Sequence, residues 1–209
     1  GQLREFGRTR RGWLGVRIQQ VTDEIAESLS LDKARGALVA DVTPDGPAKS
    51  AGIQAGDVIL KFAGQDVAEM RELPRIVAET QLGELEAAEK ASLKQEEEQA
   101  PSGPQGAQSR VDSLGLGLAT LTPQLRAEYS IGDQVEGVVV TEVDPAGTAG
   151  EKGLRPGDVI VEVAQDEVRS PDDVARGVKA ATEKGRKSVL LLVDRQGEMR
   201  FVALRIDKG

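Results

Sequence analysis

The chain carries one stretch of sequence twice, and this duplication decides the fold. The stretch Ala48-Lys-Ser-Ala-Gly-Ile-Gln-Ala-Gly-Asp-Val-Ile59 returns as Ala149-Gly-Glu-Lys-Gly-Leu-Arg-Pro-Gly-Asp-Val-Ile160, about 100 residues later. The match extends upstream to Leu14-Gly15-Val16, which corresponds to Leu114-Gly115-Leu116. Solenoid repeats are roughly 20 to 50 residues long, so a domain-sized period indicates a duplicated domain. We therefore expect two homologous modules.

Composition narrows the kinds of site that the chain can hold. Cysteine and histidine are both absent, which excludes disulfides, thiolate metal sites and a Ser-His-Asp triad. We expect no metal, no cofactor and no catalytic residues. A third possibility, a hydrolase that uses Ser, Lys and Asp, is supported only by the presence of these residue types. The net charge of −8 argues against a general nucleic-acid surface, and no apolar run approaches a membrane span.

The residue pattern predicts small β-rich modules. Aromatic residues make up only 2% of the chain, so the cores must be built from Val, Ile, Leu and Ala. Apolar runs predict strands over 16–21, 38–42, 138–143 and 189–193, and capping and periodicity predict helices over 70–79 and 171–182. Asp57 and Asp158 each follow a turn glycine, which favours a role in satisfying the turn backbone over acid–base chemistry. The expected fold class is α+β, mainly β, with two partly open β-sandwich or barrel modules that each carry capping helices.

Composition shifts set the expected boundaries. Residues 1–9 read as a linker, 10–83 as the first module, 84–110 as a charged helix followed by a flexible joint, and 111–209 as the second module. The helix is expected over 84–98 from its Ala, Glu and Lys content, and the joint over 100–107 from its Pro and Gly content.

The first repeat lacks a counterpart of one segment in the second. Lys187 to Val193, a turn at Asp194-Arg-Gln-Gly197 and a strand over 199–206 predict a closing hairpin in the second repeat. Aligning Thr80 with Thr182 leaves residues 183–204 unmatched in the first repeat. Either residues are missing after Thr80 or another chain supplies the strands, because a module lacking both would expose its core.

The duplicated stretch resembles the signature of PDZ domains. Arg10-Arg-Gly-Trp-Leu-Gly-Val16 further resembles the carboxylate-binding loop of the first PDZ domain in HtrA/DegP-type serine proteases, and Gln2-Leu-Arg-Glu-Phe-Gly7 resembles the exit from their protease domain. The resemblance implies the tandem PDZ domains of a periplasmic serine endoprotease that acts in protein quality control and the stress response. It also implies a homo-oligomeric full-length protein, unfolded or C-terminal substrate peptides as partners, and a protease domain of the same polypeptide upstream.

The first repeat offers the better candidate site. A peptide C-terminus presents a carboxylate, an apolar side chain and a backbone edge, which a Gly-containing loop, a helix-lined pocket and a strand can bind. We expect the loop to be Arg11, Gly12, Trp13, Leu14, Gly15 and Val16. We expect the pairing strand and pocket to include Arg17, Ile18, Leu73, Ile76 and Val77. Two alternatives stay open: Arg11 as a solvated linker residue, and Trp13 as a cover over apolar surface.

The second repeat offers a weaker version of the loop. Its expected residues are Ser113, Leu114, Gly115 and Leu116, and the acidic Asp112 leads into them, whereas Arg10 and Arg11 lead into the loop of the first repeat. A negative charge there opposes a carboxylate ligand, so we expect weaker peptide binding and contact between domains as its main role. Two functions therefore compete for the chain as a whole: a peptide-binding regulatory module and a structural connector that holds protease trimers in cages.

Overall fold

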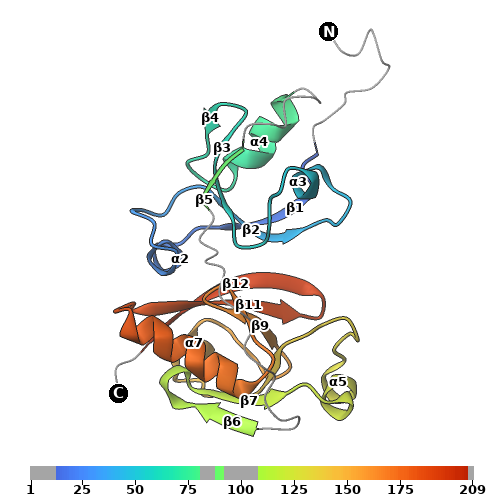
Figure 1. The fold of residues 1–209 in the computed structure, drawn as a ribbon, viewed down its shortest axis with the longest axis vertical. Coiled ribbons are helices and arrows are strands. Elements are labelled where there is room, and N and C mark those ends of the chain that lie inside the picture. Colours follow the sequence, from blue (N-terminus) through green and yellow to red (C-terminus); the bar gives the residue numbers. More distant parts are fainter. Residues whose placement is uncertain (1–12, 81–87, 92–107, 207–209) are drawn as a thin grey trace. The chain divides into compact units, whose positions relative to one another are not determined.

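The computed structural model describes residues 13–80, 88–91 and 108–206 (Figure 1). The chain divides into two compact units. The first unit consists of the residues up to Val21 together with Arg35–Ser92, and the second consists of Thr22–Ala34 together with the residues from Leu93 onward.

The first unit contains a five-stranded antiparallel sheet. Its strands are β1 (Val16–Gln20), β2 (Ala37–Val42), β3 (Val58–Phe62), β4 (Gln65–Asp66) and β5 (Ala88–Ala91). They lie in the order β1-β2-β3-β4, with β5 also pairing with β3. The expected strands over 16–21 and 38–42 are therefore confirmed as β1 and β2.

Two helices complete the first unit: α3 (Pro47–Ser50) and α4 (Glu72–Glu79). The helix α4 begins two residues later than the expected Met70. The core residues include Leu14, Val39, Ile59, Leu73 and Ile76, which pack in one cluster. Leu73 and Ile76 are three residues apart, so they share the face of α4 that is turned to the core.

The second unit contains a longer antiparallel sheet. Its strands are β6 (Gln108–Val111), β7 (Leu116–Thr120), β8 (Val138–Val143), β9 (Val159–Val163), β10 (Asp166–Glu167), β11 (Ser188–Arg195) and β12 (Glu198–Arg205). The order is β12-β11-β9-β8-β7-β6, with β10 pairing with β9, so the described strands form an open sheet. The expected closing hairpin is confirmed as β11 and β12, which pair from Ser188↔Arg205 to Arg195↔Glu198.

The helices of the second unit are α2 (Asp23–Ser28), α5 (Pro123–Tyr129), α6 (Thr148–Glu151) and α7 (Pro171–Glu183), with a 3₁₀ turn η1 at Asp112–Leu114. The expected helix over 171–182 is confirmed as α7. Its start has the expected capping box: the Ser170 side chain accepts from the N–H of Asp173, and the Asp173 carboxylate accepts from the N–H of Ser170.

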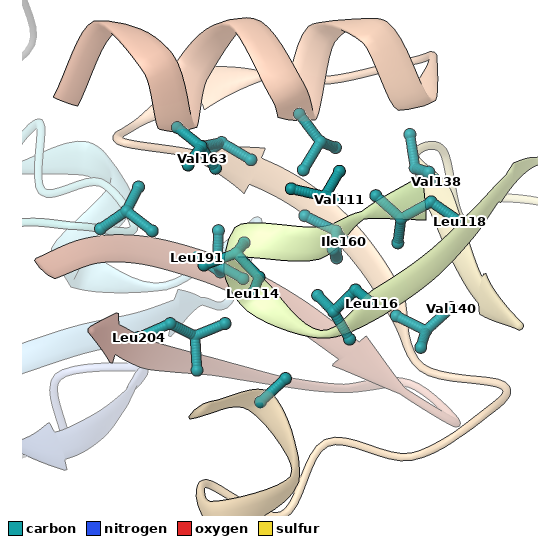
Figure 2. Packing of buried hydrophobic residues seen from close by; sticks show 14 of the residues in the cluster. Val111, Leu114, Leu116, Leu118, Val138, Val140, Ile160, Val163, Leu191 and Leu204 are labelled. Carbon is teal, nitrogen blue, oxygen red and sulfur yellow. The ribbon is translucent and has the colours of Figure 1, made fainter. Parts of the chain in front are cut away.

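The core of the second unit lies between its sheet and α7. Val111, Leu116, Leu118 and Ile160 belong to one cluster, in which Figure 2 shows Val111 closer to this helix than Leu116. The cluster also contains Val174, Val178 and Ala181 of α7, the helix residues that the sequence pattern assigned to the core.

Strand β5 corrects the expected charged helix over 84–98 and bears on the missing closing hairpin of the first repeat. The register of β5 on β3 runs from Val58↔Ala91 to Phe62↔Ala88, and the corresponding residues of the second repeat, Val159 and Val163, pair with β11 in the same way. The charged helix expected over 84–98 is therefore wrong at Ala88–Ala91. Hydrogen bonding to the edge of β3 outweighs the helix propensity of Ala-Glu-Lys-Ala.

Among the described residues of the first repeat, β5 is the strand that lies in the place of β11. The missing segment was expected between Thr80 and Gln81, and Gln81 lies outside the described residues. Strand β6 is a second departure from the expected organisation, because Gln108–Arg110 was placed in the 84–110 segment between the modules.

The two repeated aspartates hold turns, as expected. The Asp57 carboxylate accepts from the N–H of Gln54 at 2.9 Å, and the Asp158 carboxylate accepts from the N–H of Arg155 at 2.9 Å. Asp158 is also bound by Arg195, with both guanidinium–carboxylate distances at 2.6 Å. The sequence did not indicate this ion pair, because 36 residues separate its two partners.

Candidate functional site

The candidate loop of the first repeat turns at Gly15. Its φ is +74°, a backbone conformation that favours glycine, and a Cβ added there would lie 3.2 Å from the Cα of Gly46. Glycine at position 15 therefore lets the loop approach the start of α3 more closely than a residue with a side chain would.

The carbonyl groups of this loop are held by the body of the module. The C=O of Leu14 accepts from the N–H of Ala48 at 3.0 Å, and the C=O of Gly15 accepts from the N–H of Thr43 at 2.9 Å. In a trans peptide, the N–H of the next residue points the opposite way. The N–H groups of Gly15 and Val16 are therefore directed away from α3 and β2. Two neighbouring N–H groups with this direction suit an oxygen anion such as a carboxylate.

Trp13 lies over this loop. Its side chain is 59% exposed, and its Cη2 and Cζ2 atoms lie 3.3 Å from the Cβ position of Gly15. Leu14 is buried in the core of the first unit. Arg11 and Gly12, the other two residues assigned to the loop, lie outside the described residues.

Strand β1 continues from the loop and is the terminal strand of its sheet in the part of the chain that the structure describes. Arg17 is exposed, whereas Val16 and Ile18 are half-buried and pack against the core cluster. The register of β1 on β2 shifts between Arg17 and Ile18, which marks a bulge.

The helix residues assigned to the pocket divide into two kinds. Leu73 and Ile76 each expose only 1% of their surface, so they are core residues that support α4 from within. Val77 is half-buried and packs against the same cluster as Val16 and Ile18. Val77 is therefore the member of this helix set that retains surface for a ligand.

The second repeat has the same loop geometry. Gly115 has a φ of +67°, its Cβ position lies 3.5 Å from the Cα of Gly147, and its C=O accepts from the N–H of Asp144 at 2.8 Å. Leu114 and Leu116 are fully buried, and Ser113 is half-buried. The strand that follows this loop, β7, has hydrogen-bonded neighbours on both sides, β8 and β6. Nothing in the sequence indicated β6 as a second neighbour.

A search of the described residues finds no group of three or more acidic side chains placed to hold a metal ion. None of the described helices combines the length and the apolar character needed to cross a membrane.

Comparisons with known proteins identify both repeats. The family model for the PDZ domain matches residues 2–86, and a second PDZ-domain model matches residues 139–195. The chain belongs to the PDZ family. The first match includes the loop at Trp13–Val16 and helix α4, whereas the second begins within β8 and does not reach Leu114–Leu116.

The two PDZ domains are similar to part of DegP-like proteases. The chain is 40% identical to a "probable periplasmic serine endoprotease DegP-like" of Brucella suis, over 99% of this chain and 42% of that protein. The protein of the same name from Halomonas elongata is 36% identical over 98% of this chain and 44% of its own length. The chain therefore spans less than half the length of these relatives, and it matches their non-protease part. The resemblance of the PDZ pair to HtrA/DegP-type proteases is confirmed.

A solved structure titled "HtrA-type protease AlgW with decapeptide" also matches. It is 43% identical in sequence, the match covers 39% of this chain and 25% of that chain, and the TM-score is 0.35.

Proposed function

We propose that this PDZ pair binds extended peptides that end in a free carboxylate and an apolar residue, mainly through its first domain. The observation that carries the proposal is the direction of the Gly15 and Val16 N–H groups in a domain of the PDZ family. PDZ domains bind peptides by β-strand addition, in which main-chain hydrogen bonds supply affinity and pockets for side chains supply specificity.

Each part of the peptide has a proposed partner. The loop Trp13–Val16 holds the carboxylate, β1 pairs with the peptide backbone, and Ile18 and Val77 contact the last side chain. Leu73 and Ile76 hold α4 in place beneath that contact, and Arg11 and Gly12 complete the loop. Because the loop precedes β1, a peptide whose C-terminus lies at the loop runs antiparallel to β1.

The setting proposed for this binding comes from the relatives. The full-length protein would be a periplasmic serine endoprotease whose protease domain receives substrates recruited by the PDZ pair, in protein quality control and the stress response. Unfolded or C-terminal segments of other proteins would be the ligands. We propose that the full-length protein is a homo-oligomer, and assembly through the PDZ pair stays the alternative role for this part of the chain.

Titration of the chain with one peptide in two forms tests the proposal. The peptide ends in valine, with either a free or an amidated C-terminus. Removing the carboxylate charge should weaken binding by about 1.5–3 kcal/mol, the usual value of a hydrogen bond to a charged group. A third peptide that ends in aspartate controls for the apolar side chain and should also bind weakly. Equal affinity for the free and amidated forms would overturn the assignment of the loop.

A further inference from the structure

In the second PDZ domain, the strand that follows the carboxylate loop is already paired on its outer side. Strand β7 has β8 on one side and β6 on the other, and β6 runs antiparallel to β7 from Gln108↔Ala119 to Val111↔Leu116. Both strands belong to the second compact unit.

Strand β6 covers one side of β7. The N–H of Leu116, at the end of the loop, points to that same side. The C=O of Gly115 is held by the N–H of Asp144, just beyond the end of β8, so the N–H of Leu116 points away from β8. Strand β6 lies on that side. It therefore occupies the edge that corresponds to the proposed peptide-pairing edge of β1.

The covering strand also reaches the helix that lines this edge. Helix α7 contacts both β6 and β7. Val111 is 6% exposed and lies in the same cluster as Leu116 and Val178, and Figure 2 shows it below α7. A side chain in this position fills the place that an apolar ligand residue would take between strand and helix.

The direction of β6 is that of a bound peptide. A ligand with its C-terminus at the loop must run antiparallel to β7, with its last residue near the start of β7. Strand β6 runs this way, and its last residue, Val111, stands opposite Leu116, the first residue of β7. Gln108-Ser-Arg-Val111 thus has the direction and the apolar final side chain expected of a ligand.

We infer that Gln108–Val111 occupies the ligand groove of the second PDZ domain in cis, so that this groove accepts a free peptide only after β6 has left it. The inference rests on the proposed function, because it takes a PDZ groove to be a peptide site. The ligand class is a short extended peptide with a free C-terminus and an aliphatic last residue. A segment tethered this closely acts at an effective concentration on the order of millimolar, so free peptides compete with it at a disadvantage.

The test uses the whole chain and a labelled peptide that ends in Gln-Ser-Arg-Val with a free carboxylate. Ser109→Pro removes a backbone N–H from the ladder, because Ser109 and Val111 direct their N–H groups to the same side. Ser109→Ala is the matched control, since it keeps the N–H. Backbone NMR shifts at residues 116–120 report the second groove, and shifts at 16–20 report the first.

In the unmodified chain and in Ser109→Ala, we expect the peptide to shift 16–20 and to leave 116–120 unchanged. In Ser109→Pro, residues 116–120 should respond as well, with affinity there raised about tenfold or more. Two results would overturn the inference. One is that residues 116–120 of the unmodified chain bind the peptide as tightly as those of Ser109→Pro. The other is that Ser109→Pro folds but its residues 116–120 show no shift when the peptide is added. If only residues 16–20 fail to shift when the peptide is added, the proposed function is contradicted. The shifts at 116–120 still test the inference about the second groove.

Amide hydrogen exchange on the unmodified chain covers the case in which Ser109→Pro does not fold. With β6 in the groove, the N–H of Leu116 should exchange slowly in the absence of any peptide. Exchange at the rate of an open strand edge would overturn the inference without any variant.

Discussion

At the scale of single residues, glycine sets the geometry of both candidate loops. Gly15 and Gly115 both have positive φ, and each brings the loop backbone against a second glycine, Gly46 or Gly147. The two domains therefore share the loop that the duplicated sequence indicated. They differ in what lies beside the strand that follows it.

The first prediction concerns Gly15. We expect Gly15→Ala to lower peptide affinity about tenfold, or ~1.4 kcal/mol, because the new Cβ pushes the loop away from Gly46. Gly52→Ala is the matched control: Gly52 has a φ of +75° and nothing within 4 Å of its Cβ position. Both variants carry the strain of a non-glycine residue at positive φ, on the order of 1–2 kcal/mol in stability. Calorimetric titration should show an affinity loss for Gly15→Ala alone, and equal affinities would contradict the role of the loop.

A second prediction concerns the buried ion pair of the second domain. Asp158 is 2% exposed, and its carboxylate is bound by Arg195, whose guanidinium also donates to the C=O of Gly153 at 2.8 Å. Asp158 holds the pKa of Arg195 above its usual value, chiefly through their hydrogen bond. Arg195→Met should destabilise the second domain by about 3 kcal/mol, because it leaves a buried carboxylate without its cation.

Urea denaturation of variants measures this loss. Lys179→Met is the control, because its pair with Glu183 is exposed and should contribute less than about 1 kcal/mol. Adding Asp158→Asn to Arg195→Met should restore part of the stability. If Arg195→Met unfolds no more easily than Lys179→Met, the pair between Arg195 and Asp158 does not stabilise the domain.

At the scale of elements, the corresponding helices α4 and α7 of the two repeats begin differently. Helix α7 starts with a capping box, whereas α4 has no side-chain cap hydrogen bond at its N-cap, Arg71. The Glu72 carboxylate instead accepts from the N–H of Ala68 at 2.8 Å, just before α4. The start of α7 is thus fixed by local sequence.

The third prediction is a pH dependence that arises from this capping box. Burial raises the pKa of Asp173. Hydrogen bonds from the Ser170 side chain and from the N–H groups of Arg169 and Ser170, together with the charge of Arg176, lower this pKa by more than burial raises it. The pKa of Asp173 therefore lies below the usual value. The ionised carboxylate therefore stabilises the fold above its unfolded pKa of about 3.9, and this stability is lost as the pH falls through the folded pKa.

Urea denaturation at several pH values should show that Asp173→Asn is less stable than the unmodified chain near neutral pH. The difference should shrink below about pH 4, where the carboxyl becomes protonated in the unfolded state and then in the folded state. Direct NMR titration of the Asp173 carboxyl gives a second reading. A titration midpoint at or above the ordinary aspartate value would contradict the prediction.

At the scale of the whole molecule, each repeat has its own core. Among the described residues, the cluster of the first unit runs from Leu14 to Val77, and that of the second runs from Val111 to Ile206. Neither cluster draws a residue from the other, as expected for a duplicated domain. We therefore propose that the two PDZ domains are separate folding modules.

The fourth prediction follows from these separate cores. A protease site inserted at 100–107 should, after cleavage, leave both cores folded, with slow amide exchange in β3 and β9, even though Thr22–Ala34 of the second unit then belongs to the N-terminal fragment. The same site inserted between Gln196 and Gly197 is the control, because it cuts the turn between β11 and β12 and should weaken the second half. Loss of structure in both halves after the first cut would show that the modules depend on each other.

The sequence by itself determined the duplicated domain, the family, the closing hairpin of the second repeat and the start of α7. These features rest on local patterns, such as turn glycines, apolar strands and a capping box, which act within a few residues. Only the tertiary structure decided that Ala88–Ala91 and Gln108–Val111 are strands, because neither segment has a strand pattern of its own. A strand edge offers backbone hydrogen bonds to whichever segment reaches it, so these pairings depend on the folded sheet rather than on propensity. For the same reason, the sequence indicated the carboxylate loop of the second domain but gave no sign of the strand that lies against it.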